Sequence, residues 1–269
     1  MPTDVINEVA LHYVVLGTGD PLVLVHGSWG DHHDWDALAP LLADEFQVVA
    51  FDRRGHSASA SPAGQGTVND DVADLAALIR HVGNGPAHVV GNSFGGSIAL
   101  RLAAQNPGLI RTVSAHEPPL MTLLTNDPAA GPFVAGFGER MGVVIALLTS
   151  GQNEAAAREF VEKIALGPAQ WDLLPPPARQ TFVRNAGTFL DEANDPDALT
   201  VEVTTLSNYK GPVLLTQGDA SPPFFAMILD TVAPALAGTK RATLEGAGHV
   251  PQMSHPKEYA EILAEHLRG

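Results

Sequence analysis

Short apolar runs rich in β-branched residues alternate along this chain with longer amphipathic stretches, and this alternation restricts the folds open to it. The runs predicted to be strands are Leu11–Leu16, Leu22–Val25, Val48–Phe51, His88–Val90, Thr112–Ala115, Val213–Thr216 and Arg241–Leu244. Several are apolar throughout, as in strands buried on both faces of a parallel sheet. The helices predicted between them are Asp36–Leu42, Asp70–Val82, Phe94–Gln105, Pro222–Leu236 and Pro256–Leu267. The alternation predicts a doubly wound α/β fold.

The alternation stops between about residues 120 and 209, where the sequence predicts helices only. Candidate helices are Asn153–Leu166 and Ala178–Leu190, and the preceding segment, 127–138, is rich in Gly and Pro. Helices inserted between two strands of such a sheet cover the carboxyl ends of the strands, where open α/β sheets bind ligands. We therefore predict a core domain of residues 1–119 and 210–269 and a helical cap of residues 120–209. The alternative is a long connection without a role in binding.

Composition excludes several classes of function. Thirty acidic residues against fifteen Lys and Arg give a formal net charge of −15 at pH 7, which repels phosphate backbones and anionic lipid headgroups. We therefore expect neither a nucleic-acid nor a membrane partner. The lack of cysteine excludes disulfides, thiolate metal sites and a cysteine nucleophile. No secretory leader is visible and no apolar run approaches the roughly 20 residues that span a bilayer, so we expect a cytoplasmic protein. The oligomeric state is left open, a homodimer included.

The strongest motif is Gly91-Asn92-Ser93-Phe94-Gly95, a G-x-S-x-G set between an apolar strand and a helical pattern. A serine at such a sharp strand-to-helix turn has a strained backbone, and bulky neighbours would clash. The turn lifts the hydroxyl above the sheet edge and directs helix N–H groups toward developing negative charge. In this context Ser93 is predicted to be a nucleophile; the alternative is an ordinary glycine-rich turn.

A serine nucleophile needs a base and an oxyanion hole. The strand Leu22–Val25 opens into a loop in which the backbone N–H of Ser28, together with that of Phe94, is predicted to hold the oxyanion. His26 would then only brace the loop. Among eleven histidines, His249 is the candidate base, because it follows the last predicted strand on a Gly-flanked loop at the same sheet edge as the nucleophile.

A metal site is the weaker interpretation of the polar segments. Asp31-His32-His33-Asp34 and Asp36 are nearly consecutive, so their side chains diverge, and no distant ligand completes a known spacing. We interpret them as a solvated loop that caps a helix. Asp52-Arg53-Arg54 after the strand Val48–Phe51 is interpreted as a structural turn whose arginines pair with acids. The sequence predicts no metal and no cofactor.

On these residues the chain resembles the α/β-hydrolase superfamily over nearly its full length. The matching landmarks, in order, are His26-Gly27, Asp52-Arg53-Arg54-Gly55-His56-Ser57, Gly91 to Gly95 and Gly248-His249. The resemblance implies an eight-stranded, mostly parallel sheet, a helical cap between the sixth and seventh strands, and hydrolysis without a cofactor.

The acid of the triad departs from the usual family pattern. The family's acid follows the seventh strand, three residues after a glycine, but that position holds Ser221, and Asp219 is out of register by two residues. Glu117 follows the sixth strand instead, as in zearalenone-type lactonases and some haloalkane dehalogenases. His116-Glu117-Pro118, Asp219 to Pro222 and Gly248 to Pro256 resemble the lactonase branch. Glu117 is therefore the predicted acid and Asp219 the runner-up.

The sequence thus predicts a serine hydrolase of an apolar or aromatic carboxylic ester or lactone. Trp29 and Trp171 are the residues expected to contact this small-molecule substrate. Two alternatives stay open: a C–C bond hydrolase of the same fold, and a ligand-binding, receptor-like protein with slow turnover. Dehalogenases and epoxide hydrolases are disfavoured, because they resemble this fold but use a carboxylate where Ser93 stands.

Overall fold

The computed structural model describes residues 2–83 and 85–269. One eight-stranded sheet organises the chain, with the strand order β1-β2-β4-β3-β5-β6-β7-β8. The strands from β3 to β8 pair in parallel, while β1 and β2 form an antiparallel edge. Their bounds are Thr3–Ile6, Val9–Leu16, Asp20–Val25, Phe46–Phe51, Ala87–Asn92, Ile110–His116, Val213–Gly218 and Lys240–Leu244. The predicted fold, eight-stranded, mostly parallel and doubly wound, is confirmed.

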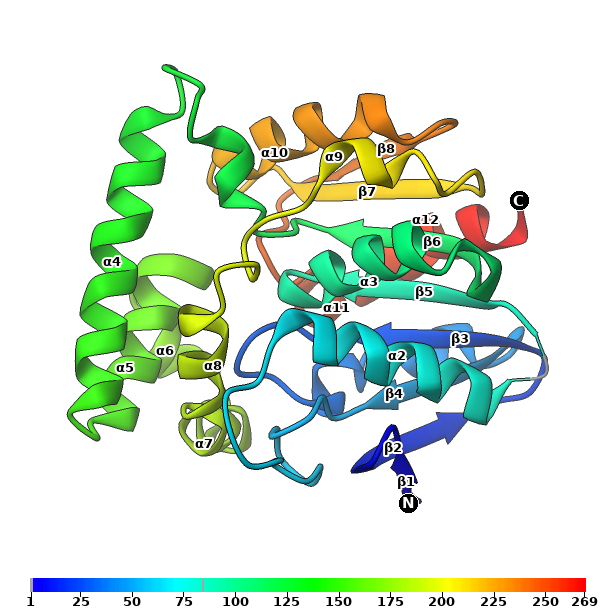
Figure 1. The fold of residues 1–269 in the computed structure, drawn as a ribbon, viewed down its shortest axis with the longest axis horizontal. Helices are drawn as coiled ribbons and strands as arrows, with labels where there is room; N and C mark the ends of the chain where they lie inside the picture. The colour runs from blue at the N-terminus through cyan, green and yellow to red at the C-terminus, as the bar shows by residue number, and fades with distance from the viewer. Residues whose placement is uncertain (1, 84) are drawn as a thin grey trace.

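Helices cover both faces of the sheet (Figure 1). On one face α2 (Val68–Val82), α3 (Phe94–Gln105) and α10 (Phe224–Val232) bury the larger apolar cluster. On the other face α1 (Ala39–Leu42) and α12 (Pro256–Arg268) bury the second cluster. The central strands β3 and β5 are almost entirely buried because they contact both clusters.

The helices between β6 and β7 lie beyond the carboxyl ends of the strands, on the left of Figure 1, except for the last of them, which lies over the sheet against α3. They are α4 (Gly131–Thr149), α5 (Asn153–Phe160), a π-helical turn (Val161–Ala165), α6 (Gln170–Leu173), α7 (Pro176–Asn185), α8 (Thr188–Asn194) and α9 (Val203–Leu206). Most share a cluster of their own, which also takes in Trp29 from the core. Leu120 and Leu206, near the two ends of the segment, are buried in the main core instead. The domain boundaries at 120 and 209 stay a prediction.

Several element bounds differ from the sequence prediction for identifiable reasons. Of the predicted helix Asp36–Leu42 only α1, Ala39–Leu42, is helical, with Pro40 in its first turn. A separate 3-10 turn, His32–Trp35, precedes it and is capped by Asp31. The predicted helix 178–190 divides into α7 and α8 around Ala186 and Gly187. Strand β1 was not predicted, since only Ile6 in it is buried.

Helix α4 begins inside the Gly- and Pro-rich segment and corrects one expectation. The Gly- and Pro-rich segment is helical from Gly131, because Pro132 stands in the first turn, where its missing N–H is not needed. By length and composition this helix of 19 residues, with mean hydropathy 1.4 and 11% of its apolar window buried, could cross a membrane. The expectation that no apolar run approaches that length is therefore wrong here. Length and composition alone do not make α4 a membrane-spanning helix, because core helices of soluble proteins share these properties.

Candidate active site

Ser93 occupies the turn between β5 and α3. Its φ of 54° and ψ of −123° lie outside the regions that side-chain-bearing residues favour, a strain that surrounding structure must hold in place. A Cβ on Gly91 would lie 2.2 Å from the carbonyl oxygen of Gly95, and one on Gly95 would lie 2.1 Å from that of Val25. Only glycine fits at either position, which explains why the motif has glycine two residues before and two residues after the serine.

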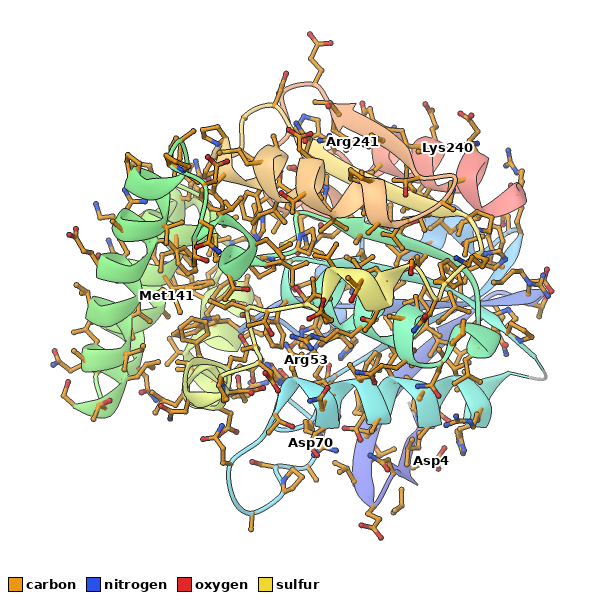
Figure 2. The ribbon with its side chains drawn as sticks, turned by 45° about the horizontal axis from the view of Figure 1, so that its top comes forward. Asp4, Arg53, Asp70, Met141, Lys240 and Arg241 are labelled. Carbon is orange, nitrogen blue, oxygen red and sulfur yellow. The ribbon has the colours of Figure 1, made fainter. Side chains whose placement is uncertain are left out.

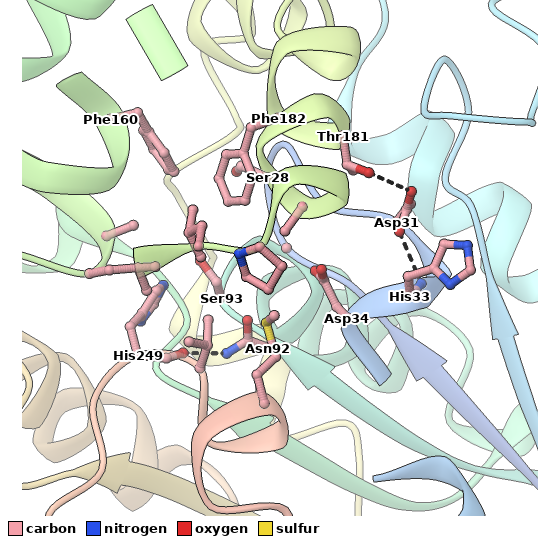
Figure 3. Close-up of a pocket in the computed structure, with 18 of the residues that line it drawn as sticks. Ser28, Asp31, His33, Asp34, Asn92, Ser93, Phe160, Thr181, Phe182 and His249 are labelled. Atoms are coloured by element: carbon pink, nitrogen blue, oxygen red, sulfur yellow. Dashed lines mark hydrogen bonds between the residues drawn. The ribbon is translucent and has the colours of Figure 1, made fainter. Parts of the chain in front are cut away.

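His249 follows β8, and three contacts hold it. Its Nδ1 lies 2.7 Å from Oε2 of Glu117. Its ring stacks on Phe225, with centroids 4.8 Å apart and planes at 19°. The amide of Asn92, next to Ser93 in the chain, donates to the His249 carbonyl oxygen at 2.8 Å (Figure 3). Ser93 and His249 line the same two cavities. The hydrogen bonds of the described residues do not join the two side chains directly, a contact that is often long in ligand-free enzymes.

Glu117 follows β6 with a φ of 45° and is fully buried. Its Oε2 also accepts from the Ser221 hydroxyl at 2.9 Å, and its Oε1 accepts from the Gly218 N–H at 2.8 Å. Burial raises the pKa of this carboxyl, but hydrogen bonds from His249 and Gly218 and the nearby His116 ring outweigh it. The pKa of Glu117 therefore lies below its usual value, and the group is a carboxylate at neutral pH.

Asp219 is exposed and occupied elsewhere: its Oδ1 accepts from the Gly246 N–H at 2.7 Å and so ties the β7 and β8 loops together. The position from which the resemblance expects an acid holds Ser221, and this serine donates to Glu117. The geometry therefore brings Glu117, rather than Asp219, to His249.

The amides of Ser28 and Phe94 donate to no other described residue. A Cβ on Gly27 would lie 3.1 Å from the Cβ of Ser93, so the loop passes directly against the nucleophile. Burial and the neighbouring Arg53 lower the pKa of His26 to about 4, which keeps its ring neutral. Its Nε2 accepts from the Arg53 amide at 3.0 Å and its Nδ1 lies 2.8 Å from the Gly27 carbonyl oxygen. His26 braces the loop.

Two cavities meet at Ser93. One of about 280 Å³ runs toward α7 and the loop after β3, and one of about 220 Å³ lies beneath α4 and α8. The residues that line both are Ser28, Ser93, Phe160, Ala165 and His249. The smaller cavity is mostly apolar, with walls that include Phe137, Met141, Phe189, Phe224 and Phe225. The larger one carries Asp31, Asp34 and Asp36 (Figure 3).

The two tryptophans expected to contact substrate do not line either of these cavities in the described structure. Trp29 is fully buried and stacks on Phe160, with centroids 5.1 Å apart, while Trp171 is buried in the same cap cluster. Their large rings fill the interior of the cap, and the smaller rings of Phe160 and Phe182 form the cavity wall. That part of the prediction is corrected.

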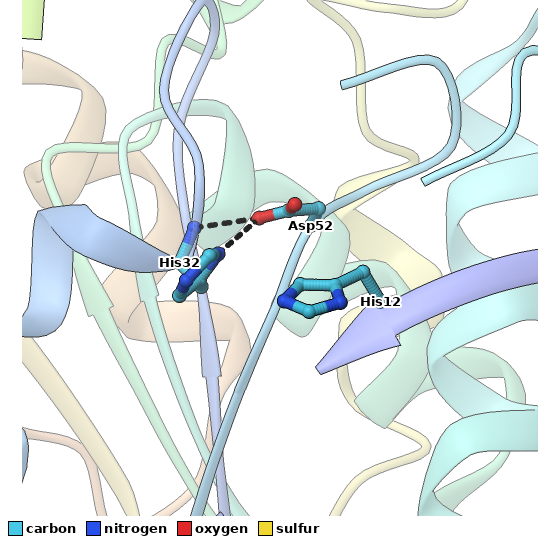
Figure 4. A group of neighbouring side chains, drawn as sticks. All are labelled: His12, His32 and Asp52. Carbon is cyan, nitrogen blue, oxygen red and sulfur yellow. Dashed lines mark hydrogen bonds and ion pairs between the residues drawn. The ribbon is translucent and has the colours of Figure 1, made fainter. Parts of the chain in front are cut away.

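Histidine and carboxylate groups gather at a second place, away from Ser93. His12, His32 and Asp52 each offer one ligand atom within 4.8 Å of the others (Figure 4). Asp52 already accepts from the His32 ring at 2.6 Å and from its backbone N–H at 2.9 Å. Despite burial, this carboxylate raises the pKa of His32, and a metal needs the neutral ring. We therefore interpret the group as an ion pair that holds the loop after β3. Asp31 caps the 3-10 turn, as predicted. The prediction that this loop is solvated is wrong for Asp31 and His32, which are buried because Asp31 bonds to the turn and His32 pairs with Asp52.

Sequence reasoning missed several residues that hold the site. Asn92 and Phe225 position His249, Ser221 donates to Glu117, and Glu192 on α8 contacts Ser28. Asn92 could have been noticed, because it precedes the nucleophile inside the motif. The others depend on which side chains meet across the fold, and no spacing in the chain reports that.

Buried histidines predict a loss of stability in acid. Burial lowers the pKa of His116 to about 4, so between about pH 6.5 and 4 the unfolded chain binds a proton there that the folded protein does not. Stability therefore falls as pH falls through this window, by about 1 kcal/mol per pH unit for this group. Urea unfolding of His116→Gln should show a shallower pH dependence by that amount, whereas His33→Gln, at an exposed position, should follow the wild type. Equal slopes in all three proteins would contradict the neutral, buried His116.

Comparison with known proteins finds relatives of this chain among hydrolases. A family model described as alpha/beta hydrolase family matches residues 22–262. An uncharacterised hydrolase of Bacillus subtilis is 38% identical over 116 residues, 42% of this chain and 43% of that protein. The chain spans less than half of the length of the curated relatives it matches.

Solved structures match over the whole chain. An alpha/beta hydrolase of Sphaerobacter thermophilus is 25% identical with a TM-score of 0.81, covering 98% of this chain and 99% of that one. An enol-lactonase of Burkholderia xenovorans is 20% identical with a TM-score of 0.81, covering 100% of both chains. At that identity the second likeness shows the fold alone.

Proposed function

The chain belongs to the alpha/beta hydrolase family, and from this premise we propose that it is a serine hydrolase that cleaves a carboxylic ester or lactone through an acyl-enzyme. One observation carries the proposal. The buried, ionised Glu117 lies 2.7 Å from Nδ1 of His249, which leaves Nε2 as the free nitrogen of a ring that shares both cavities with Ser93. A carboxylate on one imidazole nitrogen and a strained serine that lines the same cavities as the ring are the parts of a nucleophilic triad.

The proposed chemistry follows from these positions. Glu117 accepts a hydrogen bond from the Nδ1–H of His249 and so leaves Nε2 unprotonated, able to take the proton of the Ser93 hydroxyl as its oxygen attacks the carbonyl carbon. The amides of Ser28 and Phe94 stabilise the negative charge on the former carbonyl oxygen. The imidazolium then protonates the leaving alcohol, and water, deprotonated by the same ring, hydrolyses the acyl-enzyme. As the carboxylic acid product leaves, the ring passes the proton that it took from water to the Ser93 oxygen, which restores the free enzyme. The cycle needs no metal or cofactor.

A panel of chromogenic esters and lactones tests this proposal. Purified protein should hydrolyse at least one apolar ester, and a fluorophosphonate that reacts with serine should abolish that activity. Absence of turnover across the panel, with tight binding of the same compounds, would instead favour the ligand-binding alternative. Preferential cleavage of a vinylogous diketone would favour the C–C bond hydrolase.

The charge of the cavities predicts which esters are cleaved. Asp31, Asp34, Asp36, Glu192 and Asp195 line the two cavities, and no lysine or arginine of the described chain does. Burial and the neighbouring Asp31 and Asp52 raise the pKa of Asp34 to about 8, so this carboxyl is mostly neutral at pH 7. The repulsion of an anionic ester therefore rests on the other carboxylates of the two cavities. We expect para-nitrophenyl hexanoate to be turned over with a kcat/KM about tenfold or more above that of the para-nitrophenyl monoester of adipate. The two esters match in length and differ in one terminal carboxylate. Preference for the charged ester would contradict this account.

The remaining expectations belong to the same proposal. The substrate is a small apolar or aromatic molecule, and neither nucleic acid nor an anionic membrane is a partner, because the net charge of −15 opposes both. We also propose that the protein is cytoplasmic. We further propose that it resembles the zearalenone-type branch, with Glu117 as the triad acid. A homodimer is compatible with it.

A further inference from the structure

One side chain of the cap reaches the proposed oxyanion loop directly. Glu192 on α8 accepts a hydrogen bond of 2.5 Å from the hydroxyl of Ser28. It is nearly fully buried and forms part of the wall of the smaller cavity. The core of the cap is otherwise an apolar cluster, so a buried carboxylate on a cap helix requires a specific explanation.

The partner of this carboxylate is Arg53, which lies in the interior where the cap meets the sheet (Figure 2). Its Nη1 donates to Oε1 of Glu192 at 3.0 Å, and Nε and Nη2 donate to the two oxygens of Asp71 on α2 at 3.1 and 2.7 Å. Its guanidinium also lies 4.7 Å from the ring centroid of Phe94. One buried cation therefore contacts the cap, a core helix and a residue of the oxyanion hole.

The same guanidinium sets the direction of the Ser28 amide. Nη1 donates to the Gly27 carbonyl oxygen at 3.2 Å, and that carbonyl belongs to the peptide unit whose N–H is on Ser28. The structure contains no cis peptide among its described residues, and in a planar trans peptide the C=O and N–H point in opposite directions. With its carbonyl held toward Arg53, the peptide turns the Ser28 N–H away from the guanidinium, and the loop is already in contact with Ser93.

We infer that Glu192 is a positioning residue for the oxyanion hole: with Arg53 it fixes the Gly27–Ser28 peptide, so that the cap helix α8 holds the donor in place. This inference rests on the proposed function. The carbonyl before Ser28 is contacted by the His26 ring and by Arg53. Two hydrogen bonds join this peptide unit to the Arg53–Glu192 pair: the one from Arg53 to that carbonyl and the one from the Ser28 side chain to Glu192. Because both end on the same ion pair, a shift of α8 would move the donor as well as the cavity wall.

The physical environment fits a coupled pair. Burial raises the pKa of Glu192, while Arg53 and the Ser28 hydroxyl oppose that shift. The carboxylate therefore depends on both partners to remain charged, and loss of either contact weakens the other. A purely structural ion pair would need Arg53 and Asp71 only, which already satisfy each other in a two-bond geometry.

Three variants test the inference. Glu192→Leu removes the acceptor and the charge, Glu192→Gln keeps an acceptor for Ser28, and Ser28→Ala keeps the Arg53 ion pair. We expect kcat on an apolar ester to fall about 10- to 100-fold for Glu192→Leu and Ser28→Ala, less than the loss of a whole oxyanion donor, and less again for Glu192→Gln. KM should stay within about threefold, because the contact acts on the transition state. Asp191→Asn, which removes a neighbouring carboxylate on the same helix, is the matched control and should leave kcat within about twofold.

The second readout is the rate at which a fluorophosphonate modifies Ser93, since its phosphoryl oxygen enters the same hole. That rate should fall in proportion to kcat, and the double variant of Ser28→Ala with Glu192→Leu should be no slower than the slower single one. Independent, additive losses would overturn the inference, as would raised KM with unchanged kcat and labelling. Unfolding midpoints show whether a variant folds. If Glu192→Leu does not fold, the kcat and labelling rates of Glu192→Gln and Ser28→Ala test the inference. If wild-type Ser93 is not labelled at all, the proposed function falls and takes this inference with it; if it is labelled at equal rates in all variants, only the inference falls.

Discussion

Ser93→Ala is expected to abolish ester hydrolysis, with kcat reduced by about 10⁴-fold or more. Alanine removes the only atom that attacks the carbonyl, and what remains is the rate that binding and the oxyanion amides give to water alone. The substitution keeps the Cβ, so the strained backbone at φ 54° and the contacts of the turn do not change. Steady-state kinetics on the best ester of the panel measures the loss.

The control for this prediction is stability. The urea midpoint of Ser93→Ala should match the wild type within about 0.5 kcal/mol, as for substitutions that remove no packed atom. Activity within tenfold of the wild type, in a protein that folds normally, would contradict the assignment of Ser93 as nucleophile.

Glu117→Gln is expected to have the second largest effect, a loss of about 10⁴-fold in kcat. The carboxylate accepts from His249 and Ser221 on one oxygen and from Gly218 on the other. Glutamine has one carbonyl oxygen, so its NH₂ must face a donor on one side. Turned toward His249, it forces the imidazole to accept at Nδ1 and places the proton on Nε2, where the base is needed.

The matched comparison is Asp219→Asn. Asparagine keeps an oxygen for the Gly246 N–H, the contact that Asp219 makes in the structure, so turnover should stay within about tenfold and any cost should appear in the unfolding midpoint. If Asp219→Asn is inactive and Glu117→Gln is active, the acid is Asp219 and the resemblance to the lactonase branch loses its main support.

The order of the elements and the candidate nucleophile could be read from the sequence because both are local. Each buried strand is an apolar run in the sequence. The Ser93 turn is recognisable from its glycines, which are needed because the backbone of other segments lies too close for a side chain. The preference for Glu117 over Asp219 came from the resemblance and from its place after a strand. The distance that supports it joins residues 132 positions apart, which only the order of the strands brings together.

The helix bounds and buried residues of the cap are harder to predict, because the sequence patterns of its helices are weaker than those of the buried strands. Helix α4 is mostly exposed although apolar, and its glycines concealed a helix that begins at Gly131. Trp29 is predicted to line the substrate pocket, but its ring packs inside the apolar cluster of the cap instead. The contact between Glu192 and Ser28 joins residues 164 positions apart, and no sequence pattern in either segment predicts it.

The most direct test is to find where a serine-directed fluorophosphonate attaches. The tryptic peptide of residues 81–101 contains two serines, Ser93 and the fully buried Ser97, which fragmentation by mass spectrometry separates. We expect one adduct per chain, on Ser93, formed at the rate at which ester hydrolysis is lost, and none in Ser93→Ala. An adduct on another residue, or full hydrolytic activity in protein without an adduct after exhaustive treatment, would contradict it.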